Sequence, residues 1–286
     1  MFDRKMLHRG KKGMYERNEF INLPDGRSLF LRVFSPVKAR NDEHDLKDLV
    51  LVFHDLGQNS GCFQPLAKFV TENKGLCAVF DLPGHGKSLG DQMKHGDIKS
   101  TESLLLDSIF MVTSIKKILG LAGDRPLKVI GHGFGALLLT YLLLYKKDLK
   151  VLLSSPLWKM NEKPVLNKRK MIEAAFKRFI PLPMLPTPYK RYGASSLITP
   201  KVQDMIDQLT SEKTLIWALQ HIETPINVLL GEQDKLLNHE AIHSFMLHLI
   251  NEKSLCTKIE GVGFDVWSED LSEEFQTFFT GWLQES

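Results

Sequence analysis

Short apolar runs alternate with longer amphipathic stretches along most of the chain. A run such as "LVLVFHD" (49–55), which is apolar throughout and ends in polar residues, is typical of a strand buried on both faces. We expect strands at 28–36, 49–55, 76–81, 127–131, 150–156, 226–231 and 256–261. We expect helices at 62–73, 101–119, 134–146, 239–252 and 270–284. This order predicts the α/β class, with a mostly parallel central sheet and helices on both faces. Chemistry is then expected beyond the carboxyl ends of the strands.

One region interrupts the alternation. Residues 157–215 contain a basic amphipathic stretch, "NKRKMIEAAFKRF" (167–179), followed by the proline-rich "IPLPMLPTP" (180–188), which cannot form a regular helix. Between Leu157 and Tyr192 there are nine Lys or Arg and two Glu. We interpret 157–215 as a helical cap inserted between a first core part, 1–156, and a second core part, 216–286. Its positive charge predicts contact with something anionic or a solvated helix face.

The composition excludes several classes of protein. The chain has 286 residues, of which 43% are hydrophobic and 25% charged, as in an ordinary globular protein. It has no apolar run of about 20 residues that would span a bilayer, and its start lacks the apolar core of a secretory signal. Its three cysteines, Cys62, Cys77 and Cys256, are widely spaced, so we expect neither a disulfide nor a metal site. These features favour a cytoplasmic protein.

Two glycine motifs resemble nucleotide sites, and we favour neither reading. "DLPGHGKS" (81–88) ends like a phosphate loop, but Asp81 replaces the first glycine and a turn-rich stretch follows instead of a helix. Gly131, Gly133 and Ala136 fit a dinucleotide fingerprint, but two strand–helix units precede them and no acidic residue ends the next strand. We therefore expect no cofactor.

A third interpretation accounts for five stretches in their order along the chain. The stretches are "FHDLGQNS" (53–60), "DLPGHGKS" (81–88), "GHGFGA" (131–136), "LLGEQDKLLN" (229–238) and "IEGVGFDVWSE" (259–269). From about Glu19 onward, with an insertion after "SSP", the sequence resembles the monoacylglycerol lipase and lysophospholipase branch (serine aminopeptidase S33 type) of the α/β-hydrolase fold. The resemblance implies an esterase site that needs a serine nucleophile, a histidine base and an acid.

Carried over onto this chain, the resemblance leaves two of these three positions without chemistry. Gly133 stands at the nucleophile position, Asp234 at the acid and Phe264 at the histidine. Glycine has no group that attacks, and phenylalanine accepts no proton. Asp55 and Phe134 fall on the oxyanion loops, and Asp55 replaces a glycine of the family. A carboxylate about 4 Å from an oxyanion would repel it by about 4 kcal/mol at a dielectric near 20.

We therefore expect a catalytically inactive hydrolase that binds an acyl or lysolipid ligand, or a protein partner, without hydrolysing it. Basic and apolar cap residues together predict peripheral contact with an anionic membrane. The alternative is an active carboxylic-ester hydrolase with an unrecognised nucleophile. We expect no nucleic-acid partner, because no aromatic-and-basic binding element accompanies the charge. The predicted ligand contacts in the cap are Trp158, Phe176, Phe179, Leu182, Met184 and Leu185.

Overall fold

A computed structural model describes most of the chain. The described residues are 5–9, 14–37, 46, 48–89, 96, 98–121, 127–161, 200–267 and 271–284. Within them no helix is long and apolar enough to cross a membrane. The greater part of the expected cap, 162–199, lies outside the described residues, and so do Phe176, Phe179, Leu182, Met184 and Leu185.

The described strands form one sheet, in the order β1-β2-β3-β5-β4-β6-β7-β8-β9. The strands from β5 to β9 run parallel, and β1, β2 and β3 are antiparallel at one end. This confirms the predicted mostly parallel α/β sheet. The strands are β1 (Lys5–Arg9), β2 (Tyr15–Asn22), β3 (Ser28–Ser35), β4 (Leu49–Phe53), β5 (Leu76–Phe80), β6 (Leu127–His132), β7 (Leu149–Ser154), β8 (Ile226–Gly231) and β9 (Leu255–Ile259).

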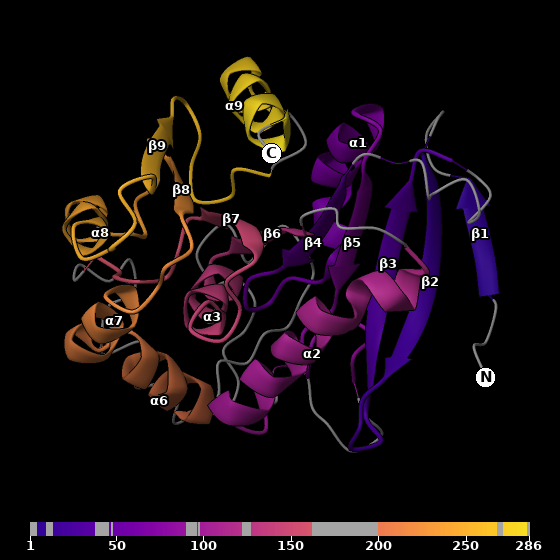
Figure 1. Ribbon diagram of the computed structural model, residues 1–286, viewed down its shortest axis with the longest axis horizontal. Coiled ribbons are helices and arrows are strands. Elements are labelled where there is room, and N and C mark those ends of the chain that lie inside the picture. The colour runs from indigo at the N-terminus through magenta and orange to yellow at the C-terminus, as the bar shows by residue number, and fades with distance from the viewer. Residues whose placement is uncertain are drawn as a thin grey trace, which may run out of the picture.

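Helices cover both faces of the sheet. Figure 1 shows α1 and α9 on one face and α2, α3, α7 and α8 on the other. Alternate residues of β4 divide between the two layers: Leu51 packs in the core under α2 and α3, and Val52 in the core under α1 and α9. The helices are α1 (Gln64–Glu72), α2 (Thr101–Leu119), α3 (Phe134–Leu142), α6 (Pro200–Leu209), α7 (Glu212–Leu219), α8 (His239–Met246) and α9 (Glu273–Gln284).

All seven predicted strands and all five predicted helices are present, with shifted ends. Helix α3 stops at Leu142 and α8 at Met246, before their predicted ends at 146 and 252. Helix α2 matches its predicted bounds because its ends are capped: Ser100 accepts from the Ser103 amide, and Gly120 adopts φ 69°. The cap boundaries at residues 157 and 215 stay a prediction. Helix α6 lies within 157–215, and α7 extends past residue 215.

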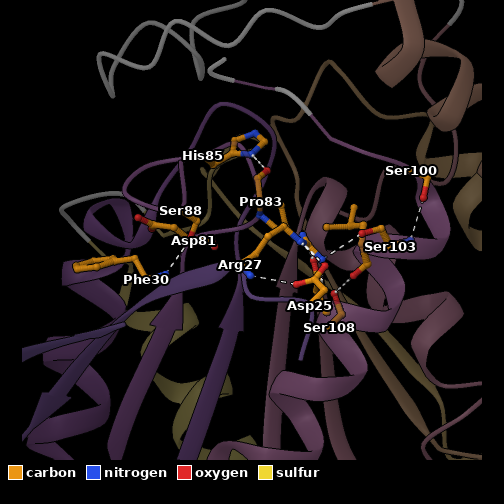
Figure 2. A network of polar contacts seen from close by, with 12 residues as sticks. Asp25, Arg27, Phe30, Asp81, Pro83, His85, Ser88, Ser100, Ser103 and Ser108 are labelled. Atoms are coloured by element: carbon orange, nitrogen blue, oxygen red, sulfur yellow. Dashed lines mark hydrogen bonds and ion pairs between the residues drawn. The ribbon is translucent and has the colours of Figure 1, made fainter. Parts of the chain in front are cut away.

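A polar cluster ties the antiparallel end of the sheet to α2. Figure 2 shows Arg27 between Asp25 and Ser103. Its guanidinium also makes two parallel bonds of 2.8 Å to Asp107 of α2. A bidentate pair of this kind fixes both distance and orientation. Beside it, Ser88 joins β3 to the loop after β5, because its hydroxyl accepts from the Phe30 amide and donates to the Asp81 carbonyl (Figure 2).

Candidate active site

The tight turn between β6 and α3 is fully formed. Gly133 adopts φ 55° and ψ −115°, a conformation that disfavours side chains. A Cβ at Gly131 would lie 2.6 Å from the Ala136 backbone, and one at Gly135 would lie 2.3 Å from the Phe53 carbonyl oxygen. Close packing against α3 and β4 therefore requires glycine at both flanking positions. The geometry is that of a nucleophile elbow, the strained turn that exposes a reactive side chain.

The carboxylate of Asp55 fills the space above this elbow. A Cβ built on Gly133 would lie 2.3 Å from the Asp55 carboxyl carbon and 2.4 and 2.8 Å from its two oxygens. The Phe134 amide, which follows the elbow residue, donates to Asp55 Oδ1 at 2.7 Å. In an α/β-hydrolase the corresponding amide is an oxyanion donor. Here an internal side-chain oxygen accepts its hydrogen bond, and the space that a side chain at position 133 would need is occupied.

The backbone around Asp55 is held by four hydrogen bonds. The Asp55 carbonyl accepts from His54 Nδ1 at 2.7 Å and from the Gln58 amide at 3.1 Å. The Asp55 amide donates to Gln58 Oε1 at 3.1 Å, and the Leu82 amide donates to His54 Nε2 at 2.9 Å. These bonds place the proton of His54 on Nδ1. Burial lowers the pKa of His54 to about 4, so its ring is neutral at pH 7.

Phe264 is the residue predicted at the histidine position. It is 5% exposed, and its ring centre lies 4.9 Å from that of His132. The Ser155 hydroxyl donates to the Phe264 carbonyl at 2.8 Å, from a residue with φ 46°. The end of β7 therefore holds this segment in place. The side chain packs as a core residue and offers no proton acceptor.

Asp234 follows β8, and half of its carboxylate is satisfied. Its Oδ1 accepts from the Leu236 amide at 2.7 Å and from the Leu237 amide at 3.4 Å. Its Oδ2 is buried and has no hydrogen-bond partner among the described residues. Burial raises the pKa of Asp234 above its usual value, against the lowering effect of the two amides and of His239.

A serine–histidine contact lies beneath the elbow. Ser154 Oγ is 3.2 Å from His132 Nδ1, and His132 Nε2 is 3.9 Å from Asp265 Oδ1. The residue types are those of a catalytic triad. Ser154 and His132 are both 0% exposed, however, and the His132–Asp265 distance exceeds that of a hydrogen bond. Burial also lowers the pKa of His132. This contact links β6 to β7 and offers substrate no access.

The other candidate nucleophiles are inert thiols. Burial raises the pKa of Cys62 to about 12 and that of Cys256 to about 11. It raises the pKa of Cys77 still further. None of the three forms a thiolate near pH 7, which nucleophilic attack by cysteine requires.

The loop that resembles a phosphate loop binds its own aspartate. Asp81 accepts from the Ser60 amide at 2.5 Å and from the Lys87 amide at 2.7 Å. A Cβ at Gly86 would lie 2.0 Å from Asp81 Oδ2, so the loop closes tightly over the carboxylate. The amides that would cradle a phosphate are already paired with an anion. Among the described residues no group of His, Cys, Asp and Glu is arranged to hold a metal ion.

Trp158, at the start of the expected cap, lies in the core. It is 0% exposed, and its indole N–H donates to Thr140 Oγ1 of α3 at 2.9 Å. The ligand contact predicted for it stays a prediction, as do those of the cap residues outside the described part of the chain.

Comparison with known proteins identifies the family. Residues 44–269 match the family model of the serine aminopeptidase S33 hydrolases, and the chain belongs to this family. Comparison with curated proteins by sequence finds no match. The predicted superfamily is thereby confirmed.

Solved structures share the α/β-hydrolase fold at low identity. A soluble variant of monoglyceride lipase from Saccharomyces cerevisiae, in complex with a substrate analog, has a TM-score of 0.71 and 17% identity, over 93% of this chain and 94% of that one. A monoacylglycerol lipase from Paleococcus ferrophilus has a TM-score of 0.61 and 20% identity, over 89% and 98%. An esterase from Exiguobacterium antarcticum has a TM-score of 0.65 and 14% identity, over 93% and 99%.

The first prediction concerns the steric conflict at the elbow. Gly133→Ser should lower the free energy of unfolding by about 2 to 4 kcal/mol, because its Cβ overlaps the Asp55 carboxylate. Gly261→Ser is the control for backbone strain alone, since Gly261 has φ 69° and no atom within 4 Å of an added Cβ. It should cost about 1 kcal/mol.

Asp55→Gly introduced together with Gly133→Ser should recover much of this loss, so that the double-mutant cycle shows a coupling above about 1 kcal/mol. Chemical denaturation measures all four proteins. Additive effects of the two substitutions would contradict the steric conflict.

The second prediction concerns Asp234. Since burial raises its pKa in the folded protein, ionisation disfavours folding, and this penalty grows as the pH rises above the unfolded value of 3.8. Asp234→Asn keeps an oxygen for the Leu236 and Leu237 amides and removes the buried charge. It should raise the free energy of unfolding at pH 7 by about 1 kcal/mol, and the gain should vanish below about pH 3.5.

Denaturation of the variant and the wild type between pH 3 and 8 measures this difference. Asp148→Asn, at an exposed position, is the control and should follow the wild type. A variant that is less stable than the wild type at pH 7 would show that the carboxylate gains more from its surroundings than burial takes away.

Proposed function

We propose that this protein is a non-hydrolysing member of the S33 family that acts by binding. The observation that carries this proposal is the Asp55 carboxylate, which accepts the Phe134 amide hydrogen bond and fills the space above Gly133. The position that would receive the oxygen of a substrate carbonyl therefore already holds an anion.

Three losses act together on the reaction. The elbow supplies no nucleophile, Phe264 supplies no base, and the amide of Phe134 is occupied. In a serine hydrolase, loss of the triad lowers turnover by about a million-fold, and the residual rate comes from the oxyanion hole and from binding. An oxyanion donor contributes about 3 to 4 kcal/mol, and here this donor is engaged as well. We therefore propose that the residual activity is lost as well.

A second candidate function is ester hydrolysis through Ser154, and the contact between Ser154 and His132 favours it. The His132–Asp265 separation of 3.9 Å and the complete burial of Ser154 oppose it. A neutral histidine with a lowered pKa is also a weak base at neutral pH. We therefore rank this candidate below binding without hydrolysis.

The proposed ligand is an acyl chain or a lysolipid that stays uncleaved. The fold shared with a monoglyceride lipase that was solved in complex with a substrate analog supports this class. The Asp55 carboxylate restricts which ligand groups can lie at the elbow. An anionic group about 4 Å from it would be repelled by about 4 kcal/mol at a dielectric near 20. The end of the ligand that reaches the elbow is therefore uncharged or a hydrogen-bond donor.

We further propose that the basic segment between Leu157 and Tyr192 contacts an anionic membrane. Its nine Lys or Arg against two Glu fit a peripheral contact with an anionic membrane by a protein of the cytoplasm. A protein partner with an acidic surface is the other reading of this charge.

The third prediction concerns reactivity. The wild type and Gly133→Ser should show no labelling by a fluorophosphonate probe and no turnover of p-nitrophenyl esters, because no base activates a hydroxyl at the elbow. The triple variant Asp55→Gly, Gly133→Ser, Phe264→His restores nucleophile, base and free amide, and should gain measurable labelling.

Ser154→Ala is the matched control for the second candidate. Labelling of the wild type that disappears in Ser154→Ala would overturn the inactive assignment and establish Ser154 as the nucleophile. Labelling of Gly133→Ser alone would show that Phe264 does not stand at the base position.

The fourth prediction concerns the ligand. Native mass spectrometry of the full chain should detect an acyl lipid or lysolipid at up to one per protein, and added lysophosphatidylcholine should bind and be recovered intact. Recovery of its free fatty acid would contradict the inactive assignment. No bound lipid, with or without addition, would overturn the lipid part and leave the inactive assignment standing.

A further inference from the structure

Ser155, at the end of β7, has a backbone conformation that its place in the sequence disfavours. Its φ is 46°, in the left-handed region that residues with a side chain rarely adopt. Pro156 follows it, and the residue before a proline is restricted to extended conformations. In the described part of the chain Lys74 is the one other residue with a side chain and a positive φ, and it lies in an exposed turn. Ser155 is 0% exposed, so its strain is stored inside the protein.

Hydrogen bonds on both sides of Ser155 hold this conformation. Its amide donates to the Leu229 carbonyl of β8 at 2.8 Å. The Gly133 amide donates to the Ser154 carbonyl at 3.0 Å, and the Leu157 amide donates to the Gly133 carbonyl at 3.2 Å. Since β7 lies between β6 and β8 (Figure 1), Ser155 is tied to the elbow on one side and to β8 on the other. Backbone strain persists only where surrounding contacts determine it in this way.

The hydroxyl of Ser155 connects this point to residues 262–267, which we call the Phe264 segment. It donates to the Phe264 carbonyl at 2.8 Å, and both residues are buried. The Phe264 ring in turn lies 4.9 Å from the ring of His132, which directly precedes the elbow glycine. Glycine would adopt the φ of Ser155 without strain, but it has no hydroxyl. The side chain of Ser155 therefore supplies the bond to Phe264 from a backbone that a glycine would suit better.

We propose that Ser155 is a positioning residue for the candidate ligand site, because it holds the Phe264 segment beside the elbow through one hydroxyl bond made from a strained backbone. This role rests on the proposed function, in which a ligand reaches the elbow. A Phe264 segment that is already fixed does not have to be ordered when the ligand binds, and such preorganisation favours binding.

Chemical denaturation of Ser155→Ala and Ser155→Gly tests the strain. At an unstrained position glycine is the less stable variant, because it loses more conformational freedom on folding. At Ser155 we expect the reverse order, with a folding equilibrium constant about fivefold to thirtyfold larger for Ser155→Gly than for Ser155→Ala. Ser154→Ala and Ser154→Gly are the matched controls, since Ser154 is the adjacent and equally buried residue, and they should show the usual order. The usual order at Ser155 as well would contradict the stored strain.

Hydrogen–deuterium exchange tests the hydroxyl bond. The Gln233 amide donates to the Val262 carbonyl at 2.8 Å, so its exchange rate reports how firmly the Phe264 segment is held. Ser155→Ala should raise this rate about tenfold, because a buried carbonyl loses its donor. Ser154→Ala is the control and should stay close to the wild-type rate, since the Ser154 hydroxyl lies against His132. Equal rates in the wild type and Ser155→Ala would overturn the proposal.

Ligand binding separates positioning from stability. Ser155→Gly is expected to be more stable than Ser155→Ala, yet it leaves the Phe264 segment freer. Lysophosphatidylcholine should therefore bind Ser155→Ala about threefold to tenfold more weakly than the wild type, and Ser155→Gly more weakly still. Affinities that follow the order of stability would overturn the positioning role. A wild type that binds none of this lipid would overturn the lipid part of the proposed function and any role of Ser155 in binding it, while the exchange rates would still decide whether Ser155 holds the Phe264 segment.

Discussion

The hydrogen bond from the Phe134 amide to the Asp55 carboxylate is the interaction on which the character of the site depends. The amide sits at the first turn of α3, where backbone N–H groups lack partners within the helix. A buried amide without an acceptor costs about 1 to 3 kcal/mol. In a hydrolase the amide is kept for an oxyanion that forms only during the reaction. Here Asp55 accepts its bond at a distance of 2.7 Å, and the helix start is satisfied without a substrate.

The elbow keeps its shape through packing contacts that do not depend on catalysis. Gly131 and Gly135 are required by contacts with Ala136 and with the Phe53 carbonyl, and these contacts concern packing alone. Gly133 then has two reasons to be glycine, its positive φ and the carboxylate beside it. With Asp55 in this position, the Cβ of a serine at the elbow would overlap the Asp55 carboxyl group, which would have to move. The proposed inactivity therefore has a steric ground besides the missing hydroxyl and imidazole.

Sequence patterns predicted the fold well because continuous apolar runs mark the strands that are buried between the helices of both faces. Continuous apolar runs marked the strands from β4 to β8, and glycine spacing marked the elbow. β1 and β2 were missed, since β2 ("YERNEFIN") is half-exposed and carries little apolar signal. The triad positions Gly133, Asp234 and Phe264 were assigned from motif order and stay predictions. The direction of a side chain cannot be predicted in this way. Motif order placed Asp55 on the oxyanion loop, but it could not show that the Asp55 carboxylate binds the Phe134 amide. The sequence nevertheless contained a signal of this contact, because the larger Asp55 accompanies Gly133, the smallest residue type.

Asp234, the residue predicted at the acid position, has a structural role that needs no histidine partner. Its Oδ1 accepts two amides of the turn that follows β8, and that turn supports the entry to the expected cap. Leu237 forms a bridge with Met160, and the Asn238 amide donates to the Lys159 carbonyl. One carboxylate oxygen thus organises the turn, while the other is buried without a partner. The structural contribution of Oδ1 needs an oxygen at this position and does not need a charge. The hydrogen bonds of Oδ1 therefore give Asp234 a structural role that is independent of catalysis.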